Sequence, residues 1–201
     1  MMIESLFSDP IYFFRFAVII IISITLHELG HGFAAIYQGD DTPIRAGHMT
    51  PNPVVHMGWP SLIFLCLIGM AWGQMPVNPS RFRNQRWGNI LVSAAGPLTN
   101  LAIATVCIII INLTKPSIVA NFLSLEFFWL AAYINFGLCI FNFLPIPPLD
   151  GFHIFSEFFP SLKPLGRSQA GYVLMMLFFV TRASRLVWGV AGVAVTFFVY
   201  G

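Results

Sequence analysis

The chain has 201 residues, of which 57% are hydrophobic and only 9% are charged, and its mean hydropathy is +0.79. This composition indicates a membrane protein and excludes an ordinary soluble enzyme. The net charge of +2 is too small, and the arginines are too scattered, to indicate a nucleic-acid partner. At roughly 20 residues per crossing, the chain accommodates about five or six transmembrane helices. We therefore expect an all-α polytopic membrane protein with one domain over residues 1–201, its core at about 11–155 and accessory C-terminal helices at about 168–201.

The N-terminus lacks the basic region and the small-residue cleavage site of a signal peptide, so we expect the first apolar segment to be retained. The three cysteines, Cys66, Cys107 and Cys139, lie in apolar runs without a paired spacing. Cysteines in such positions are usually small buried or lipid-facing side chains. The sequence therefore predicts neither disulfides nor cysteine metal ligands.

The first predicted helix runs from Ile11 to about Gln38 and ends at a Gly-Asp-Asp sequence. Near the end of its apolar part it carries His27, Glu28 and His31. Ionisable side chains within a membrane segment usually face a protein interior or a wet cavity and mark function. Residues four apart share a helix face, so the two histidines with the glutamate beside them form the pattern of a zinc site with a carboxylate base.

The next stretch, Thr42 to Pro79, carries little charge and is interrupted by prolines and glycines. Its apolar part, Ser61 to Trp72, is too short for a plain crossing and favours a re-entrant or interfacial segment. His48 and His56 lie in this stretch, and neither has a helical partner at ligand spacing. We expect them to be loop histidines at the interface, without a metal role.

A basic cluster then precedes a charge-free run that ends at Thr114 and predicts a second spanning helix. This run contains Gly96-Pro97 and, three residues later, Asn100. Two interpretations stay open: a close-packing kink that Gly96 and Pro97 create, or a direct role for Asn100, whose amide could bind a neighbouring helix or the site. A short loop at Lys115-Pro116 follows.

The third uncharged run, Phe127 to Leu149, ends in a proline-rich sequence before Asp150. The prolines, Pro145 and Pro147 among them, cannot continue a helix, so the backbone must open there. Open backbone at membrane depth lines a cavity or packs against protein. A carboxylate beside it is therefore a candidate functional group, although it could instead cap the following helix. His153 could share a face with Asp150, but two histidines and one carboxylate already complete a catalytic set.

Two further apolar runs, at about 171–180 and 186–200, predict two short helices or one broken pair. If residues 42–79 dip without crossing, one side of the membrane receives Arg45, Arg81, Arg83, Arg86, Lys163 and Arg167. The other side receives Arg15, Lys115, Arg182 and Arg185. The excess and the tight arginine cluster make the first side cytoplasmic. A helix from Phe127 to Leu144 is roughly 27 Å long and brings Asp150 to about the depth of His31, so we expect the site nearer the cytoplasmic face.

Two imidazoles and one carboxylate would hold one Zn²⁺ per chain and leave a place for water, whose proton Glu28 could accept and pass to a leaving amine. The predicted reaction is hydrolysis of a peptide bond. A site among membrane helices implies a substrate that is itself embedded in the lipid bilayer and that unwinds locally. Backbone opened near Pro145 to Pro148, or the loop before Pro60, could pair with the unwound strand. Asn142 could hold the substrate or stabilise the oxyanion.

Together, His27-Glu28-x-x-His31, Gly96-Pro97-x-x-Asn100 and Asn142-x-x-Pro145-x-Pro147-x-Leu149-Asp150-Gly151 resemble the site-2 protease family of intramembrane zinc metalloproteases. The resemblance implies that His27, His31 and Asp150 bind zinc, that Glu28 is the base, and that Asn142 helps to hold substrate or the oxyanion. It also implies cleavage of membrane proteins in or near their transmembrane segments. The chain resembles a compact member without a PDZ domain, and His153 departs from the family pattern.

Two other classes of protein can carry such a ligand set. A metal-binding membrane transporter would use the same three ligands but would not require Glu28 as a base. A proteolytically silent relative that only binds membrane proteins would be expected to have lost a ligand or the base, and this chain keeps all four residues. The sequence therefore favours the protease.

Overall fold

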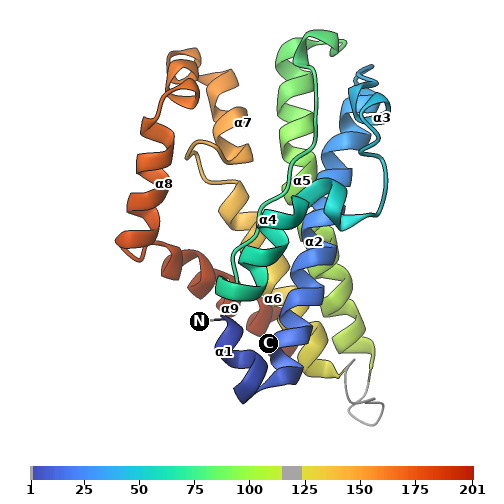
Figure 1. Ribbon diagram of the computed structural model, residues 1–201, viewed down its shortest axis with the longest axis vertical. Helices are drawn as coiled ribbons and strands as arrows, with labels where there is room; N and C mark the ends of the chain where they lie inside the picture. The colour runs from blue at the N-terminus through green and yellow to red at the C-terminus, as the bar shows by residue number, and fades with distance from the viewer. Residues whose placement is uncertain (1, 115–123) are drawn as a thin grey trace.

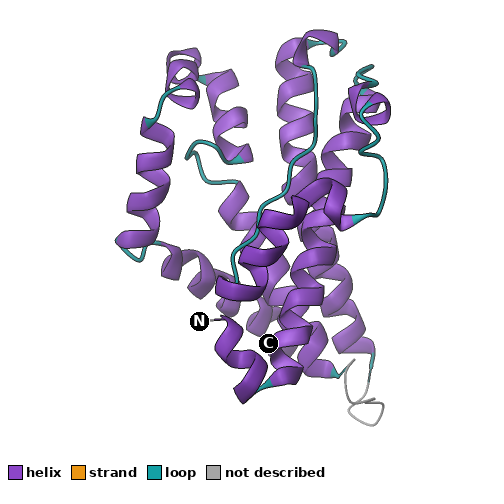
Figure 2. Cartoon of the chain, viewed as in Figure 1, coloured by secondary structure: helices purple, strands orange, loops and turns teal. Residues whose placement is uncertain are grey.

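The structure is a computed structural model that describes residues 2–114 and 124–201 (Figure 1). Within these residues every regular element is helical (Figure 2). The α-helices are α1 (Met2–Ser8), α2 (Pro10–Tyr37), α3 (Thr42–Arg45), α4 (Pro53–Ile68), α5 (Gln85–Leu113), α6 (Leu125–Asn142), α7 (Asp150–Phe158), α8 (Ala170–Val180) and α9 (Ser184–Tyr200), and the 3-10 helices are η1 (Pro79–Arg81) and η2 (Pro160–Arg167). The all-α prediction is confirmed. The loop expected at Lys115-Pro116 lies outside the described residues.

Helix α2 begins and ends where local signals place its ends. The Asp9 side chain accepts a hydrogen bond from the backbone of Tyr12, and Pro10 occupies the first turn, where its missing N–H costs nothing. The helix ends before Gly39, whose φ of 95° favours glycine. Its 28 residues extend about 42 Å, more than the roughly 30 Å hydrocarbon core. The predicted first spanning helix is confirmed.

Helix α5 lies in the middle of the bundle and packs against both α2 and α6. Asn84 and Ser124 cap the N-termini of α5 and α6 through their side-chain oxygens. The buried apolar core joins residues of α2, α4, α5, α6 and α9: Ile19, Ile20, Ile24, Met57, Leu65, Cys107, Ala131, Ala132, Ile134 and Val195. Cys66, Cys107 and Cys139 are free thiols, as predicted. This shared core packs α2, α5 and α6 against one another.

The number of spanning helices is smaller than the sequence suggested. Within the described residues, α2, α5 and α6 are long and apolar enough to cross a membrane, and α8 with α9 forms a pair bent by 63° that makes at most a fourth span. The prediction of about five or six crossings is therefore wrong. The estimate divided apolar length by the length of one crossing, whereas this chain uses much apolar sequence in α4 and in the extended segment after it, which do not cross. The prediction of two short helices or one broken pair at the C-terminus is confirmed.

Residues 42–79 dip into the bundle and return, as predicted for a re-entrant segment. Helix α4 is interrupted at Gly58, where φ is 68°, and ends at Gly69, where φ is 87°. A Cβ on Gly69 would lie 3.5 Å from Met2 near the other end of the molecule. The chain then climbs back as an extended strip, residues 70–78, to the start of α5 (Figure 1). Both ends of the segment thus lie at the same end of α2.

The extended strip is fastened to α4 through alternate residues. The Ser61 hydroxyl donates to the carbonyl of Trp72 at 2.7 Å and accepts from its N–H at 2.8 Å. The N–H of Gln74 donates to the carbonyl of His56 at 3.0 Å. Among the hydrogen bonds of the described residues, none uses the N–H of Gly73 or Met75. The strip therefore has one bonded edge and one open edge, as an edge strand does.

Asp40 ties the upper end of the strip to the end of α2. Its buried carboxylate accepts from the Asn78 N–H at 2.6 Å and from the N–H and hydroxyl of Thr42 at 3.0 and 2.5 Å. Burial alone would raise the pKa of Asp40, but these hydrogen bonds and the charge of Arg81 outweigh burial and lower it. The charged carboxylate therefore stabilises the fold.

This lowered pKa predicts a loss of stability in acid. A carboxyl whose pKa is lower in the folded state contributes its full stability above the unfolded value of about 3.9, and the contribution is lost as pH falls through the folded pKa. We expect wild type to unfold at a higher temperature than Asp40→Asn above about pH 5, and the difference to shrink below about pH 4. Thermal unfolding in detergent measures it, and a pH-independent difference would contradict the assignment.

Close packing of α6 against α9 requires glycine at position 137. A Cβ there would lie 2.2 Å from the Trp188 ring, whereas a Cβ on Gly192 would lie 3.6 Å from Tyr133, an ordinary contact. We expect Gly137→Ala to lower the free energy of unfolding by about 1–3 kcal/mol through overpacking. Gly192→Ala is the matched control and should be neutral or stabilising by up to about 1 kcal/mol, because alanine favours helix. Equal unfolding midpoints for the two variants would show that α9 is not held this tightly.

Candidate metal centre and active site

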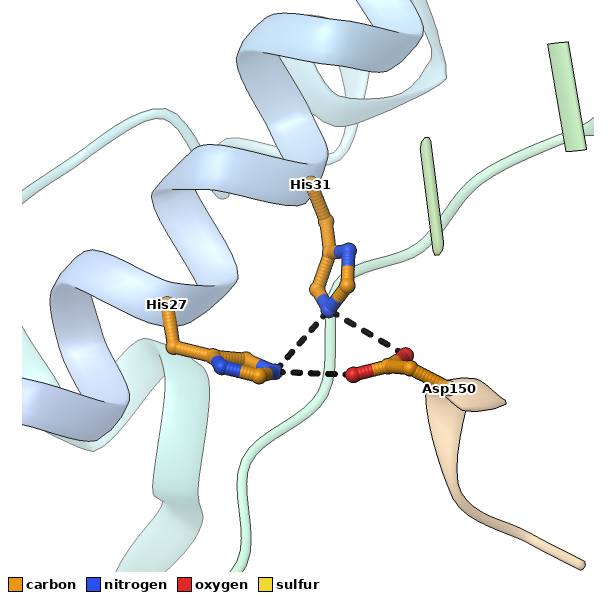
Figure 3. Close-up of side chains that lie close together, drawn as sticks. All are labelled: His27, His31 and Asp150. Atoms are coloured by element: carbon orange, nitrogen blue, oxygen red, sulfur yellow. Dashed lines mark hydrogen bonds and ion pairs between the residues drawn. The ribbon is translucent and has the colours of Figure 1, made fainter. Parts of the chain in front are cut away.

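Three side chains from two distant stretches of the chain meet at one point. The Nε2 atoms of His27 and His31 are 3.0 Å apart. Asp150 places one carboxylate oxygen 3.1 Å from His27 Nε2 and the other 3.4 Å from His31 Nε2. Figure 3 shows both imidazoles on α2 directed at the carboxylate, which comes from the start of α7. The expectation that His31 and Asp150 lie at one depth is confirmed.

The spacing and donor types fit a zinc ion. One ligand atom from each residue can be chosen so that all three lie within 4.8 Å of one another. Ligands about 2.0–2.2 Å from a tetrahedral zinc lie about 3.3 Å from one another, close to the distances between these three residues. Imidazole nitrogen and carboxylate oxygen are ordinary zinc ligands. Among the described residues this is the only group of three with metal-ligand spacing.

Hydrogen bonds from α5 fix the orientation of both imidazoles. His27 Nδ1 lies 2.6 Å from Asn100 Oδ1, and His31 Nδ1 lies 2.6 Å from the carbonyl of Val92. A carbonyl oxygen only accepts, so each Nδ1 carries the proton and each Nε2 presents its lone pair to Asp150 and the site. A second partner of this kind is usual for histidines that bind metals.

Gly96 lies between those two anchors on α5. Val92, Gly96 and Asn100 are spaced by four residues, so they line one face of α5 and match the four-residue spacing of His27 and His31. A Cβ on Gly96 would lie 2.4 Å from His31 Nε2 and 2.5 Å from His27 Nε2. Gly96 therefore permits close approach, and Asn100 contacts the site through His27.

Asp150 is aimed by the tight turn that precedes α7. The helix starts at Asp150 after the extended Leu149, so Asp150 lies in the first turn and not at the N-cap, and its carboxylate oxygens face the two imidazoles. A Cβ on Gly151 would lie 2.2 Å from the carbonyl oxygen of Phe143 and 2.5 Å from that of Leu144. Glycine at this position lets α7 begin against the end of α6, which directs Asp150 toward α2.

Glu28 lies beside the three-residue cluster and under the extended strip. Its side chain is buried on α2, and a Cβ on Gly73 would lie 2.6 Å from Glu28 Oε1. Glycine at position 73 therefore lets the strip pass directly over the carboxylate. A cavity of about 840 Å³ is lined by Glu28, by the cluster and by Gly73. A carboxylate that faces this cavity can exchange a proton with a bound water or substrate.

The same cavity extends to a polar group formed by α5, α7 and η2. Asn89, Glu157 and Lys163 all line it. Glu157 accepts a hydrogen bond from the Asn89 amide at 2.9 Å and pairs with Lys163 at 2.9 Å. The arrangement of a zinc-type ligand set, a buried carboxylate and a large cavity is that of a metal-dependent hydrolase.

The comparisons with known proteins agree with this chemistry. The sequence model of peptidase family M50 matches residues 15–125 and 110–183, which together make up more than half of the chain. The chain belongs to peptidase family M50. This confirms the resemblance to the site-2 protease family, and with the apolar helices α2, α5 and α6 it establishes a multi-pass membrane protein.

Three relatives illustrate the similarity. "Putative zinc metalloprotease YwhC" of Bacillus subtilis is 33% identical over 181 residues, which cover 85% of this chain and 83% of that protein. "Putative zinc metalloprotease Rip2" of Mycobacterium tuberculosis is 30% identical over 150 residues, which cover 72% of this chain and 56% of Rip2. "Putative zinc metalloprotease MJ0611" of Methanocaldococcus jannaschii is 36% identical over 88 residues, which cover 43% of this chain and 44% of MJ0611. No solved structure matches the chain.

The residues of this M50 protein that are predicted to bind substrate, Asn142, Pro145 and Pro147, lie in different environments. Asn142 lines the cavity, and its amide donates to the Leu138 carbonyl at 3.0 Å, leaving its oxygen available. Pro145 is exposed and Pro147 is buried against Gly171, and neither lines the cavity. Their neighbour Pro148 does line it. The opened backbone of residues 145–148 thus reaches the cavity at Pro148.

The remaining histidines lie outside the metal cluster, and the prediction of a loop histidine at the interface is wrong for His56, because it is buried on α4. His153 lines the cavity one helical turn after Asp150, with its ring near Phe152. His48 and His56 face each other with ring centroids 6.1 Å apart. Sequence reasoning missed Asn135, which is fully buried and hydrogen-bonded to Asn100. Its signal was present, because it is an amide in an apolar run.

Proposed function

We propose that this M50 protein is an intramembrane zinc metalloendopeptidase that hydrolyses peptide bonds in or near the transmembrane segments of membrane proteins. The observation that carries the proposal is the convergence of His27, His31 and Asp150 beside the buried Glu28, on a cavity between apolar helices. The names of the relatives YwhC and Rip2 as zinc metalloproteases support the same activity.

In this proposal His27 and His31 bind zinc through Nε2, and Asp150 binds it through a carboxylate oxygen. Zinc bound there would polarise the scissile carbonyl and acidify a water molecule. The hydrogen bonds from each Nδ1 to α5 hold both imidazoles turned with Nε2 toward the site. The carboxylate of Asp150 balances part of the metal charge in a region poor in other charges.

Glu28 is the proposed general base and acid. Its carboxylate takes the proton of the attacking water and delivers it to the leaving amine nitrogen as the peptide bond breaks. Burial beneath the strip at Gly73 holds the side chain at the cavity and limits exchange with bulk water. The amide of Asn142 is proposed to hold the substrate or to donate to the oxyanion as negative charge develops on the scissile carbonyl.

The open edge of the extended strip is the proposed docking line for an unwound substrate. Gly73 and Met75 line the cavity and keep their N–H groups free of hydrogen bonds within the described residues. An extended peptide could pair there by strand addition, which gives affinity through main-chain hydrogen bonds. We also propose that the turn containing Pro145 and Pro147 supports the substrate from the opposite side, with Pro148 at the cavity wall.

The orientation in the membrane is part of the proposal. Helix α3, the start of α5 and the end of α7 lie at one end of the molecule, and α1 lies toward the other (Figure 1). The first end carries the arginine-rich loops, which favours the cytoplasmic side. The site would then open nearer the cytoplasm, within a single domain over residues 1–201 whose core is about 11–155 and whose accessory helices are about 168–201.

The test is zinc content and cleavage by the purified protein in detergent or liposomes, with a model transmembrane substrate. We expect one zinc per chain and a product cut within or near the apolar segment, and we expect chelation to stop cleavage. Asp150→Ala should lose zinc and activity, because two ligands hold zinc far less tightly than three. His153→Ala, one turn further along α7, is the matched control for zinc content. A wild-type protein without zinc would overturn the proposal, and undiminished zinc in Asp150→Ala would remove it as a ligand.

A further inference from the structure

A chain of buried hydrogen bonds runs from His27 through two asparagines to α6. His27 Nδ1 binds Asn100 Oδ1 at 2.6 Å, and the Asn100 amide donates to Asn135 Oδ1 at 2.9 Å. The Asn135 amide donates in turn to the Ala131 carbonyl at 2.9 Å and to the Ser23 hydroxyl at 2.8 Å. Both asparagine side chains are fully buried. The chain thus links α2, α5 and α6 with every amide group in use.

The direction of this chain is fixed at its far end. The carbonyl of Ala131 can only accept a hydrogen bond, so the Asn135 NH₂ must face it and the Asn135 oxygen must face Asn100. That oxygen also only accepts, so it draws the Asn100 NH₂ and turns the Asn100 oxygen toward His27. One backbone carbonyl on α6 therefore determines that His27 is protonated at Nδ1.

The opposite arrangement carries a penalty in this environment. If the Asn100 amide flipped, its NH₂ would face His27 and its oxygen would face the Asn135 oxygen, leaving buried groups without partners. A buried polar group without a partner is costly in a protein interior. A flipped amide would also favour the tautomer with the proton on Nε2, the atom that faces the metal site. His31 needs no such chain, because a backbone carbonyl anchors it directly.

We propose that Asn100 and Asn135 are positioning residues that hold His27 in the tautomer able to bind zinc through Nε2. The proposal rests on the proposed zinc site, but it assigns a separate role to residues outside the ligand set. Asn135 acts indirectly. It contacts neither the imidazole nor the metal position, but it orients the Asn100 amide, which contacts the imidazole. Its substitution therefore changes metal affinity through amide orientation.

The first test is the zinc dissociation constant of the full chain in detergent, measured by competition with a chromophoric chelator. We expect Asn135→Leu, which has similar size and no acceptor, to weaken zinc binding by about 10–100-fold, as loss of other outer partners does. Ser23→Ala is the matched control, since it removes a buried hydrogen bond to the same amide but keeps the Ala131 anchor. It should bind zinc like wild type. Thermal unfolding of the zinc-free proteins checks that all variants are folded.

The second test asks whether orientation is the cause. Asn100→Asp presents an oxygen to His27 whichever way it turns, so it does not depend on Asn135. We expect Asn135→Leu to weaken zinc binding in the Asn100 background and to have little effect in the Asn100→Asp background. A double variant as weak as Asn135→Leu alone would overturn the proposal, and so would Asn135→Leu with wild-type affinity.

A measurement on the wild type keeps the proposal testable if Asn135→Leu does not fold. Ring ¹⁵N spectra of the zinc-loaded protein should show His27 protonated at Nδ1 and metal-bound at Nε2. The reverse pattern would contradict the proposed roles of Asn100 and Asn135 but would not contradict the zinc site. A wild-type protein that binds no zinc would contradict both the roles of Asn100 and Asn135 and the proposed function. Failure of the positioning roles alone can therefore be distinguished from failure of the proposed function.

Discussion

Glu28→Gln is expected to reduce cleavage of a transmembrane substrate by about 10²–10⁴-fold, the usual contribution of a general base. Glutamine has nearly the same size and keeps one oxygen, but it cannot take up the proton of the attacking water. Zinc content should stay at one per chain, because Glu28 is outside the cluster of His27, His31 and Asp150. The measurement is the initial rate of cleavage together with metal analysis of the same preparation.

Glu157→Gln is the matched control, because it makes the same chemical change in a residue that lines the same cavity away from the metal cluster. It should lose its ion pair with Lys163 and keep most of the cleavage rate. Near-normal cleavage by Glu28→Gln would contradict the mechanism. A metal transporter with these ligands would keep its transport in Glu28→Gln, and a silent relative would show no cleavage in the wild type, so the same set of proteins separates the three classes.

The metal cluster could be predicted from the sequence because each of its parts carries a local signal. His27 and His31 follow helical spacing, and Asp150 follows a run of prolines that must open the backbone. Helix length then gave the depth of Asp150, since α6 has the 18 residues needed to reach the level of His31. Periodicity and length are properties of one segment, and they survive folding unchanged.

What the sequence did not show depends on contacts between segments. Gly73 and Asn135 lie far along the chain from the residues they serve, and neither sits in a recognisable motif. The prediction of the number of crossings failed for a related reason. An apolar run such as residues 61–72 has the composition of a membrane helix whether it crosses or turns back. Contacts between segments, such as those of Asn78 with Asp40 and of Arg83 with Gln38, show that the chain returns to its starting side.

The structure also shows why α5 is the organising helix of the site although it supplies no ligand. Its residues Val92 and Asn100 hold the two imidazoles from one side, and Gly96 between them leaves room for the ligand atoms. The four-residue spacing on α5 matches that on α2. Two packed helices therefore fix the geometry of the histidine pair before any metal binds, which is the preorganisation that metal catalysis requires.

This packing predicts that Gly96→Ala abolishes zinc binding and cleavage. The added methyl carbon would lie 2.4 Å from His31 Nε2 and 2.5 Å from His27 Nε2, well inside the contact distance of about 3.5 Å. Because Val92 and Asn100 hold both rings from the same helix, the imidazoles cannot swing aside without losing their hydrogen bonds. We expect zinc below the detection limit of metal analysis and no measurable product.

Gly189→Ala is the control for the general effect of replacing a helical glycine in this protein. A Cβ at Gly189 would meet nothing within 4 Å, so the change should leave zinc and cleavage intact and stabilise α9 by up to about 1 kcal/mol. Thermal unfolding of both zinc-free variants separates loss of the site from loss of the fold. If Gly96→Ala keeps wild-type zinc affinity, α5 does not lie against the two ligands as described, and the roles of Asn100 and Asn135 fall with it.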